Sequence, residues 1–361
     1  MATGTLDARR APIVNALGTL NNPNAGVAAE TGGQLNQRAA DLTIDARAID
    51  DALRSGLAAV NVTIGYTAGD DDPFESTVRD LAYWDEIVRT NDELVKVYTA
   101  EDISRAHDDG RLGIIYGFQN AAMVGADASR INLFADLGVR VVQLTYNAVN
   151  KLGGGCMAPG NPGLSDLGRE VIDRLNERNL MVDLSHSGER TCLDAARYSR
   201  TPISINHTGC RALVDLPRNK TDEELRAVAE RGGFVGIYFM PFLNASGHAT
   251  AADVVEHIAH AVDVCGIDQV GIGTDGSATP IDDLDGYLVT LADHVEARRA
   301  SGAGAAGERA DTVPFVKDLS GVGQFERLAG LLGDRGFGAE QIDKLLGGNF
   351  IAYAQRVWAD A

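Results

Sequence analysis

Two histidines in similar local sequences are the side chains of this chain best suited to metal or proton chemistry. His186 ends the segment MVDLSH, and His207 ends the segment PISINH twenty-one residues further on. Imidazole nitrogens are common zinc ligands, and the carboxyl ends of neighbouring parallel strands can bring two such rings together. We therefore expect His186 and His207 to be paired metal ligands.

A carboxylate follows a third strand-like segment. Asp275 ends VGIGTD, where two glycines leave open space beside the carboxyl group. It could act as a general base, as a third metal ligand or as the partner of a helix N-terminus, and the sequence alone does not choose among these roles. Gln119 and Tyr146 also end strand-like segments, so we place both beside Asp275 as candidate catalytic residues.

An arginine is placed where it could bind a substrate. Arg218 lies eleven residues after His207, ahead of a helix that opens with the capping-box pair Thr221 and Glu224. A guanidinium near the mouth of a barrel suits two-point binding of a carboxylate. A surface arginine paired with Asp222 or Glu223 is equally compatible with the pattern.

Short β-branched segments alternate with helical patterns and must position these side chains. The expected strands are residues 12–17, 58–64, 112–118, 139–146, 180–186, 202–207, 233–239 and 269–275. Eight strand-helix repeats predict a (β/α)8 TIM barrel, with a doubly wound sheet as the alternative. The polar residues at the strand ends favour the barrel.

The rest of the chain is expected to complete one barrel domain over residues 1–361. Residues 147–164 and 276–315 are expected to be loops that roof a pocket, and helices from Phe315 onward are expected to pack outside the barrel. The 51 acidic against 32 basic residues give a formal charge of −19, which disfavours nucleic acid and anionic lipid as partners. With neither a signal peptide nor a membrane-spanning segment in the pattern, we expect a cytoplasmic protein.

Several motifs in order resemble the renal, or membrane, dipeptidase family. They are MVDLSHSGERTCLDAARYSRTPISINHTGCRALVDLPRN, LGVRVVQLTYNAVN, VGIGTD and LLGGNFIAYAQRVW, and the resemblance runs from about residue 12 to the C-terminus. It implies an amidohydrolase-like barrel with two zinc ions that cleaves small dipeptides or similar amides. It also implies that His186 and His207 bind zinc, that Arg218 holds the substrate carboxylate and that Asp275 contacts the substrate amine and moves a proton. Asn147, beside Tyr146, joins Arg218 in the expected substrate site.

The sequence departs from the family pattern at the remaining ligands. The D-x-H-x-D of the first strand is matched by Asn15, Leu17 and Thr19, and the bridging glutamate is matched by Gln119. A histidine near the oxyanion is matched by Tyr146. Since two zinc ions bring four positive charges and these positions supply no carboxylate, we expect one divalent metal, zinc in the first instance, or no metal at all.

Three functions are compatible with these residues. The first is a divergent hydrolase of a small carboxylate-bearing amide or amino-acid derivative, in which Asp275 moves a proton and Tyr146 or Gln119 polarises the carbonyl. The second is a lyase, decarboxylase or isomerase that uses the same pocket. The third is an inactive protein that binds a small molecule. We expect a homodimer, which is usual among the proteins that the chain resembles.

Overall fold

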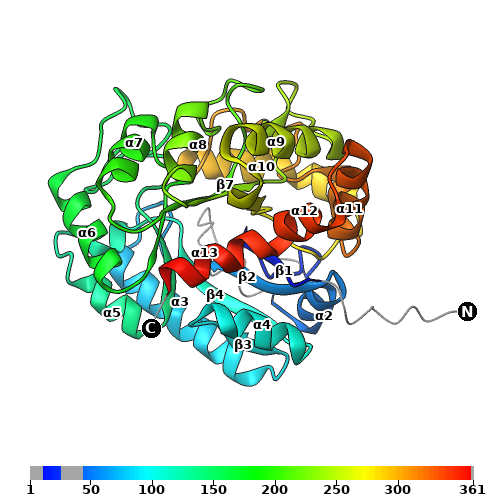
Figure 1. Ribbon diagram of the computed structural model, residues 1–361, viewed down its shortest axis with the longest axis horizontal. Helices are drawn as coiled ribbons and strands as arrows, with labels where there is room; N and C mark the ends of the chain where they lie inside the picture. Colours follow the sequence, from blue (N-terminus) through cyan, green and yellow to red (C-terminus); the bar gives the residue numbers. More distant parts are fainter. Residues whose placement is uncertain (1–10, 26–43, 359–361) are drawn as a thin grey trace, which may run out of the picture.

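The computed structural model describes residues 11–25 and 44–358, and its centre is a parallel β-barrel (Figure 1). The barrel strands follow one another in the order β1-β2-β4-β5-β6-β7-β8-β9, and every neighbouring pair is parallel. They are β1 Ile13–Gly18, β2 Leu57–Thr63, β4 Leu112–Phe118, β5 Val139–Gln143, β6 Met181–Asp183, β7 Ser204–Thr208, β8 Phe234–Ile237 and β9 Val270–Ile272. Each corresponds to one predicted strand, so the (β/α)8 fold is confirmed.

The first and last strands close the barrel through the segment that follows β9. The backbone N–H of Asp275 donates to the carbonyl of Leu17 at 2.9 Å, and the N–H of Thr19 donates to the carbonyl of Gly276 at 3.1 Å. These bonds satisfy backbone groups that an open sheet edge would leave unpaired. Asp275 therefore lies at the seam between β1 and β9.

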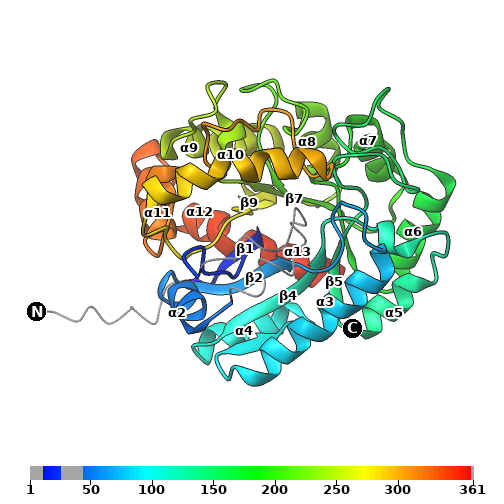
Figure 2. The ribbon, with the colours of Figure 1, turned by 180° about the vertical axis from the view of Figure 1, so that it is seen from behind.

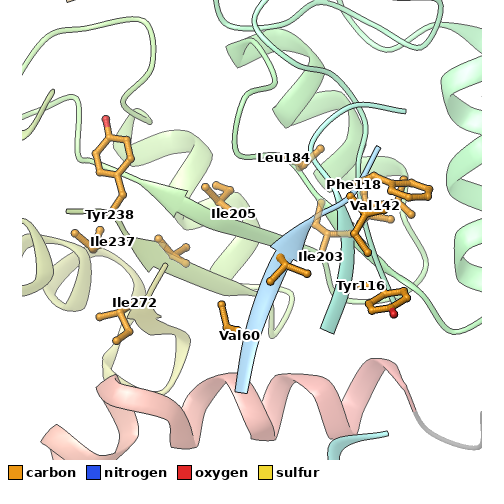
Figure 3. Packing of buried hydrophobic residues seen from close by; sticks show 14 of the residues in the cluster. Val60, Tyr116, Phe118, Val142, Leu184, Ile203, Ile205, Ile237, Tyr238 and Ile272 are labelled. Atoms are coloured by element: carbon orange, nitrogen blue, oxygen red, sulfur yellow. The ribbon is translucent and has the colours of Figure 1, made fainter. Parts of the chain in front are cut away.

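Alternate side chains of β4 enter two different apolar layers. Ile114, Tyr116 and Phe118 of β4 belong to the large cluster between the strands and the outer helices, as Figure 3 shows for side chains of several strands. Ile115 belongs instead to a second cluster that includes Phe350. This alternation is the two-residue period of a β-strand, and it explains why these strands are buried on both faces.

The second cluster joins the amino-terminal end of the barrel to the last helix, α13 (Asn349–Val357). Asn349 donates to the carbonyl of Val270 at 2.7 Å, and the Trp358 indole donates to the carbonyl of Arg140 at 3.3 Å. Both carbonyls lie at or near strand starts, so α13 crosses this end of the barrel (Figure 1). The prediction that the C-terminal helices pack outside the barrel is confirmed.

The other helices surround the strands. They are α2 Ala46–Arg54, α3 Pro73–Thr90, α4 Ala100–Asp108, α5 Arg130–Asp136, α6 Asp166–Glu177, α7 Glu189–Tyr198, α8 Asp222–Ala229, α9 Ala251–Cys265, α10 Leu284–Ala300, α11 Gln324–Arg335 and α12 Ala339–Asp343. The capping box predicted for α8 is present, with the Thr221 hydroxyl accepting from the Glu224 N–H at 3.2 Å and Glu224 accepting from the Thr221 N–H at 2.9 Å.

The structure differs from the sequence pattern in two places. Residues 74–97 have apolar residues at helical spacing throughout, but helix α3 ends at Thr90, and Leu94–Lys96 form a short strand, β3, that pairs with β4. The expected loop over residues 276–315 contains the 17-residue helix α10. Apolar residues of α10 at helical spacing, from Leu284 to Val295, do share one face, but an exposed Val289 and an inward Arg298 obscure this period in the sequence.

Candidate active site

The two predicted histidines lie together at the carboxyl end of the barrel. His186 is in the turn after β6, His207 is in β7, and their Nε2 atoms are 3.0 Å apart. Both side chains are buried, with 4% and 0% of their surface exposed. The convergence follows from the parallel pairing of β6 with β7, which places the ends of these strands side by side.

Asn147 determines which nitrogen of His186 carries the proton. The Asn147 amide nitrogen donates to the carbonyls of Ala303 and Gly304, so its Oδ1 is the acceptor that faces His186 Nδ1 at 2.7 Å. His186 therefore donates through Nδ1 and presents the lone pair of Nε2 to His207. The Tyr146 ring stacks on His186, with ring centres 4.2 Å apart.

His207 is bound less completely than His186. Its Nε2–H donates to His186, which leaves Nδ1 as a buried acceptor that has no hydrogen-bond partner among the described residues. Burial lowers the pKa of both imidazoles well below the ordinary value, and the nearby positive charge of Arg218 lowers both further. Both rings are therefore neutral at pH 7, the form in which a histidine can bind a metal.

Arg218 is buried beneath the histidine pair. Its guanidinium donates to the carbonyl of Ser185 at 2.7 Å and to the carbonyl of His207 at 3.0 Å. Only 2% of its surface is exposed, and it stacks 5.3 Å from the Tyr238 ring centre. In this arrangement Arg218 links the two chain segments that carry the histidines, and its predicted contact with a substrate carboxylate stays a prediction.

A cavity of about 410 Å³ opens beside the histidines. Polar groups that line it are Thr63, Gln119, Tyr146, Asp275, Arg298 and Glu308, and apolar walls come from Phe239, Phe242, Leu291, Val295 and Phe315. The predicted catalytic residues are thus brought together in its lining. In the described part of the chain, the side chains of His186, His207, Asn147 and Arg218 lie in the surrounding structure and not in that lining.

Asp275 is held in an unusual backbone conformation. Its φ of 60° lies in the left-handed region, which is strained for a residue with a side chain, although Asp and Asn tolerate it best. Burial raises the pKa of its carboxyl group to about 6, although the positive charges of Arg218 and Arg298 oppose this shift. A carboxyl group that titrates near neutral pH in a cavity can accept and return a proton.

Arg298 is one of two arginines, with Arg309, that line the cavity and were not predicted from the sequence. It lies on α10 and pairs with Glu308 at 2.8 Å, and its positive charge opposes the rise that burial causes in the pKa of Tyr146. The dipeptide Arg298-Arg299 looks like a solvent-exposed pair at the end of a helix, and α10 itself was expected to be a loop. Only the fold brings this position over the carboxyl ends of the strands.

The positions that match the missing family ligands are occupied by neutral groups. Asn15 exchanges two 2.8 Å hydrogen bonds with Thr274, and Gln119 donates to the Thr63 hydroxyl at 2.6 Å. Leu17 is buried, and its carbonyl takes part in the β1–β9 seam. These side chains provide no negative charge to offset the charge of two cations.

The donor set does not fit a pair of zinc ions. Within residues 11–25 and 44–358, no three His, Cys, Asp or Glu side chains are grouped so that they could hold a metal. His186 and His207 offer one cation two neutral nitrogens, and the Asn147 contact to His186 is the kind of outer hydrogen bond that orients a metal-binding imidazole. His207 has no equivalent contact among the described residues, so a metal on its Nε2 would leave a buried Nδ1–H unpaired.

The barrel, with a cavity at the carboxyl ends of its strands, has the architecture in which TIM-barrel enzymes place their active sites. A model of the membrane dipeptidase family, peptidase family M19, matches residues 34–287. The chain therefore belongs to this family, which places it among the hydrolases, and the family resemblance seen in the sequence is confirmed.

Individual relatives agree with this assignment. An uncharacterised protein from the pqqA 5′ region of Klebsiella pneumoniae is 30% identical over 215 residues, covering 56% of this chain and 79% of that protein. Dipeptidase tcpJ of Claviceps purpurea is 27% identical over 272 residues, which cover 74% of this chain and 56% of tcpJ. The match thus spans about half the length of the similar dipeptidases.

Solved structures show the same fold over nearly the whole chain. An amidohydrolase from Pseudomonas aeruginosa has a TM-score of 0.77 at 28% identity, with 97% of both chains covered. A metallopeptidase from Rhodobacter sphaeroides, solved with a phosphinate mimic of the dipeptide L-Ala-D-Ala, has a TM-score of 0.70 at 19% identity, covering 97% of this chain and 100% of that one. At that identity the second likeness establishes the fold alone.

No helix within residues 11–25 and 44–358 is both long enough and apolar enough to cross a lipid bilayer.

Proposed function

We propose that the chain hydrolyses a small amide or amino-acid derivative that bears a carboxylate and an apolar group. Family membership supports hydrolysis, and the apolar walls contributed by Phe239, Leu291 and Phe315 suit an apolar substituent. The observation that carries the proposal is the carboxyl group of Asp275, which lines the cavity and has a pKa raised to about 6.

Each polar residue of the cavity has a separate role in the proposed reaction. Ionised Asp275 takes a proton from the attacking water or holds the substrate amine, and it returns the proton to the leaving nitrogen. The Tyr146 hydroxyl and the Gln119 amide are donors that can polarise the substrate carbonyl. If His186 and His207 bind one divalent metal, zinc in the first instance, that ion supplies Lewis-acid activation of water.

Arg298 is our candidate for binding the substrate carboxylate. It lines the cavity, whereas Arg218 is occupied by two backbone carbonyls. Glu308 already neutralises part of the Arg298 charge, so we expect moderate binding of an anionic substrate. The sequence-based role of Arg218 requires the substrate to displace those backbone contacts.

A non-hydrolytic reaction is the second candidate, and one observation favours it. The positions that match the family's carboxylate ligands hold Thr19 and Gln119, while Asp275 and the neutral histidine pair remain. A lyase, decarboxylase or isomerase needs proton transfer and a substrate anchor, both of which these residues can provide, and it does not need an activated hydroxide.

Incubation with dipeptides and N-acyl amino acids in H2 18O tests the proposal. We expect one 18O atom in the carboxylate product, and we expect Arg298→Met to raise KM at least about tenfold for the acid but not for its carboxamide analogue. Arg218→Met is measured with the same two substrates, as the matched variant for the alternative in which Arg218 binds the carboxylate. Turnover without 18O incorporation would support the non-hydrolytic candidate, and absence of turnover across the panel would contradict the proposed substrate class.

A further inference from the structure

Helix α10 and the segment that follows it form the outer wall of the cavity. We call residues 284–315 the cover. Figure 2 shows α10 on the near side of the barrel, whereas α13 is nearest the viewer in the opposite view of Figure 1, so the two helices lie at opposite ends. The cover contributes Tyr287, Leu291 and Arg298, among others, to the cavity lining.

Most apolar side chains of α10 pack within the cover, whereas Ala305 packs against the large barrel cluster. Leu291, Val295 and Val313 form a buried cluster with partly buried neighbours such as Phe315, and this cluster is separate from both clusters of the barrel. An element with its own small cluster can separate from the barrel without exposing the main core. Such elements lie at the low-stability end of a protein, from which active-site lids are drawn.

Two consecutive residues of the barrel face the cover. Asn147 Nδ2 donates to the carbonyls of Ala303 at 3.0 Å and Gly304 at 3.1 Å, and Tyr146 lines the cavity together with Arg298 of the cover, whose positive charge acts on the Tyr146 hydroxyl. Asn147 is 1% exposed, so these bonds are shielded from water. The segment after β5 thus connects the barrel to the cover.

The same two residues hold the imidazole of His186. Asn147 Oδ1 accepts from Nδ1 at 2.7 Å, and the Tyr146 ring stacks on the imidazole with 22° between the planes. The amide of Asn147 therefore has both ends in use, with its nitrogen bound to the cover and its oxygen bound to His186. Rotating the amide by half a turn would break both sets of bonds at once.

We propose that Asn147 is a positioning residue that couples closure of the cover to the orientation of His186. With the cover closed, the carbonyls of Ala303 and Gly304 fix the amide so that Oδ1 receives Nδ1–H, and Nε2 points at His207. When the cover lifts, the amide loses both acceptors and can turn, so His186 loses its fixed tautomer and ring angle. Substrate then enters an incomplete site, which is completed as the cover closes over it.

A substitution in the cover, remote from His186, tests the coupling. Leu291→Asp introduces a charge into the cover cluster, and Val289→Asp is the matched control, because Val289 is 80% exposed on the same helix. We expect Leu291→Asp to increase backbone hydrogen exchange across residues 284–304 by about tenfold or more. The 15N signals of the His186 ring should change from one fixed tautomer to an average of two. Val289→Asp should change neither measurement.

Further variants keep the test decisive. Leu291→Ala replaces Leu291→Asp if the charged variant does not fold, and Asn147→Ala should produce the His186 change directly. Faster hydrogen exchange in the cover with unchanged His186 signals would overturn the proposal. Equal effects of Leu291→Asp and Val289→Asp would also overturn it. Neither measurement requires turnover. The proposed coupling can therefore fail while the proposed hydrolysis stands, and the reverse is also possible.

Discussion

Two features of Asp275 are energetically unfavourable, and a residue with a purely structural role at this position would need neither. Its backbone is in the left-handed region, and its carboxyl group is buried with a pKa of about 6. Costs of this kind collect at functional sites, where the surrounding structure maintains a conformation or a charge that the residue would not adopt alone. Here the β1–β9 seam provides that support, because the Asp275 N–H is bonded to Leu17.

Substitution of Asp275 should separate activity from stability. Between pH ~4 and ~6 the folded chain keeps a proton on Asp275 that the unfolded chain has lost, so the free energy of unfolding falls as pH rises through this window. Asp275→Asn removes the charge, and asparagine tolerates φ of 60°. We expect kcat/KM to fall about 10²-fold or more, and stability at pH 7 to rise by about 2 kcal/mol.

Urea unfolding at pH 4 and pH 7 and the pH profile of kcat/KM check this prediction. Activity of the unsubstituted protein should rise through pH ~6, where Asp275 ionises, and the stability gain of the variant should vanish near pH 4. A variant that is less stable than the parent at pH 7 would contradict the assigned burial cost.

Arg218 should prove important for folding. Arg218→Met removes the donors to the Ser185 and His207 carbonyls, and we expect a loss of about 2–4 kcal/mol, since each buried carbonyl left unpaired costs about 1–3 kcal/mol. Arg218→Lys, which keeps the charge but not the fork of donors, should recover part of the loss. Urea unfolding measures both, and a loss below about 0.5 kcal/mol for Arg218→Met would show that these bonds are dispensable.

Among single residues, those at the strand ends could be predicted from the sequence, whereas the residues that surround them could not. His186, His207 and Asp275 could be found because each ends a strand pattern, and parallel strands end at a common edge. Arg298 could not be found, because its position depends on where α10 crosses the cavity. That Arg218 donates to two backbone carbonyls could not be predicted either, because these contacts depend on the tertiary structure.

The strands of the barrel could be predicted because their burial is recorded in the local sequence. Strands buried on both faces give continuous apolar segments, and this signal identified all eight barrel strands. β3 was missed because it is three residues long and follows the helical pattern of α3 closely. α10 was missed because an exposed Val289 and an inward-facing Arg298 obscure the helical spacing of its apolar residues.

Helix α13 should stabilise the barrel from the end opposite the cavity. Phe350 is 1% exposed and meets Phe234 edge to face at 5.3 Å. We expect Phe350→Ala to cost about 3–5 kcal/mol, because it leaves a cavity in a close-packed core. Gln355→Ala on the exposed side of the same helix should stay within about 0.5 kcal/mol. Equal stability of the two variants in thermal or urea unfolding would show that α13 is a peripheral helix.

The whole molecule combines a family barrel with a cavity whose polar groups differ from the family pattern. The strands form the barrel that the membrane dipeptidase resemblance implies, and the histidine pair and Asp275 lie at its carboxyl end, whereas Asn15, Leu17, Thr19 and Gln119 stand at the positions of anionic or histidine ligands. That nucleic acid and anionic lipid are not partners, which we expect from the formal charge of −19, is a prediction. The homodimer and the cytoplasmic location stay predictions.

Our central claim is that the site has lost the anionic ligands needed for two cations. The zinc content of the chain tests this claim most directly. Protein purified with added zinc and then freed of excess metal should contain at most one zinc ion per chain by elemental analysis. Any bound zinc should be absent from the double variant His186→Ala/His207→Ala. Two zinc ions per chain, or one that survives the loss of both histidines, would contradict the account.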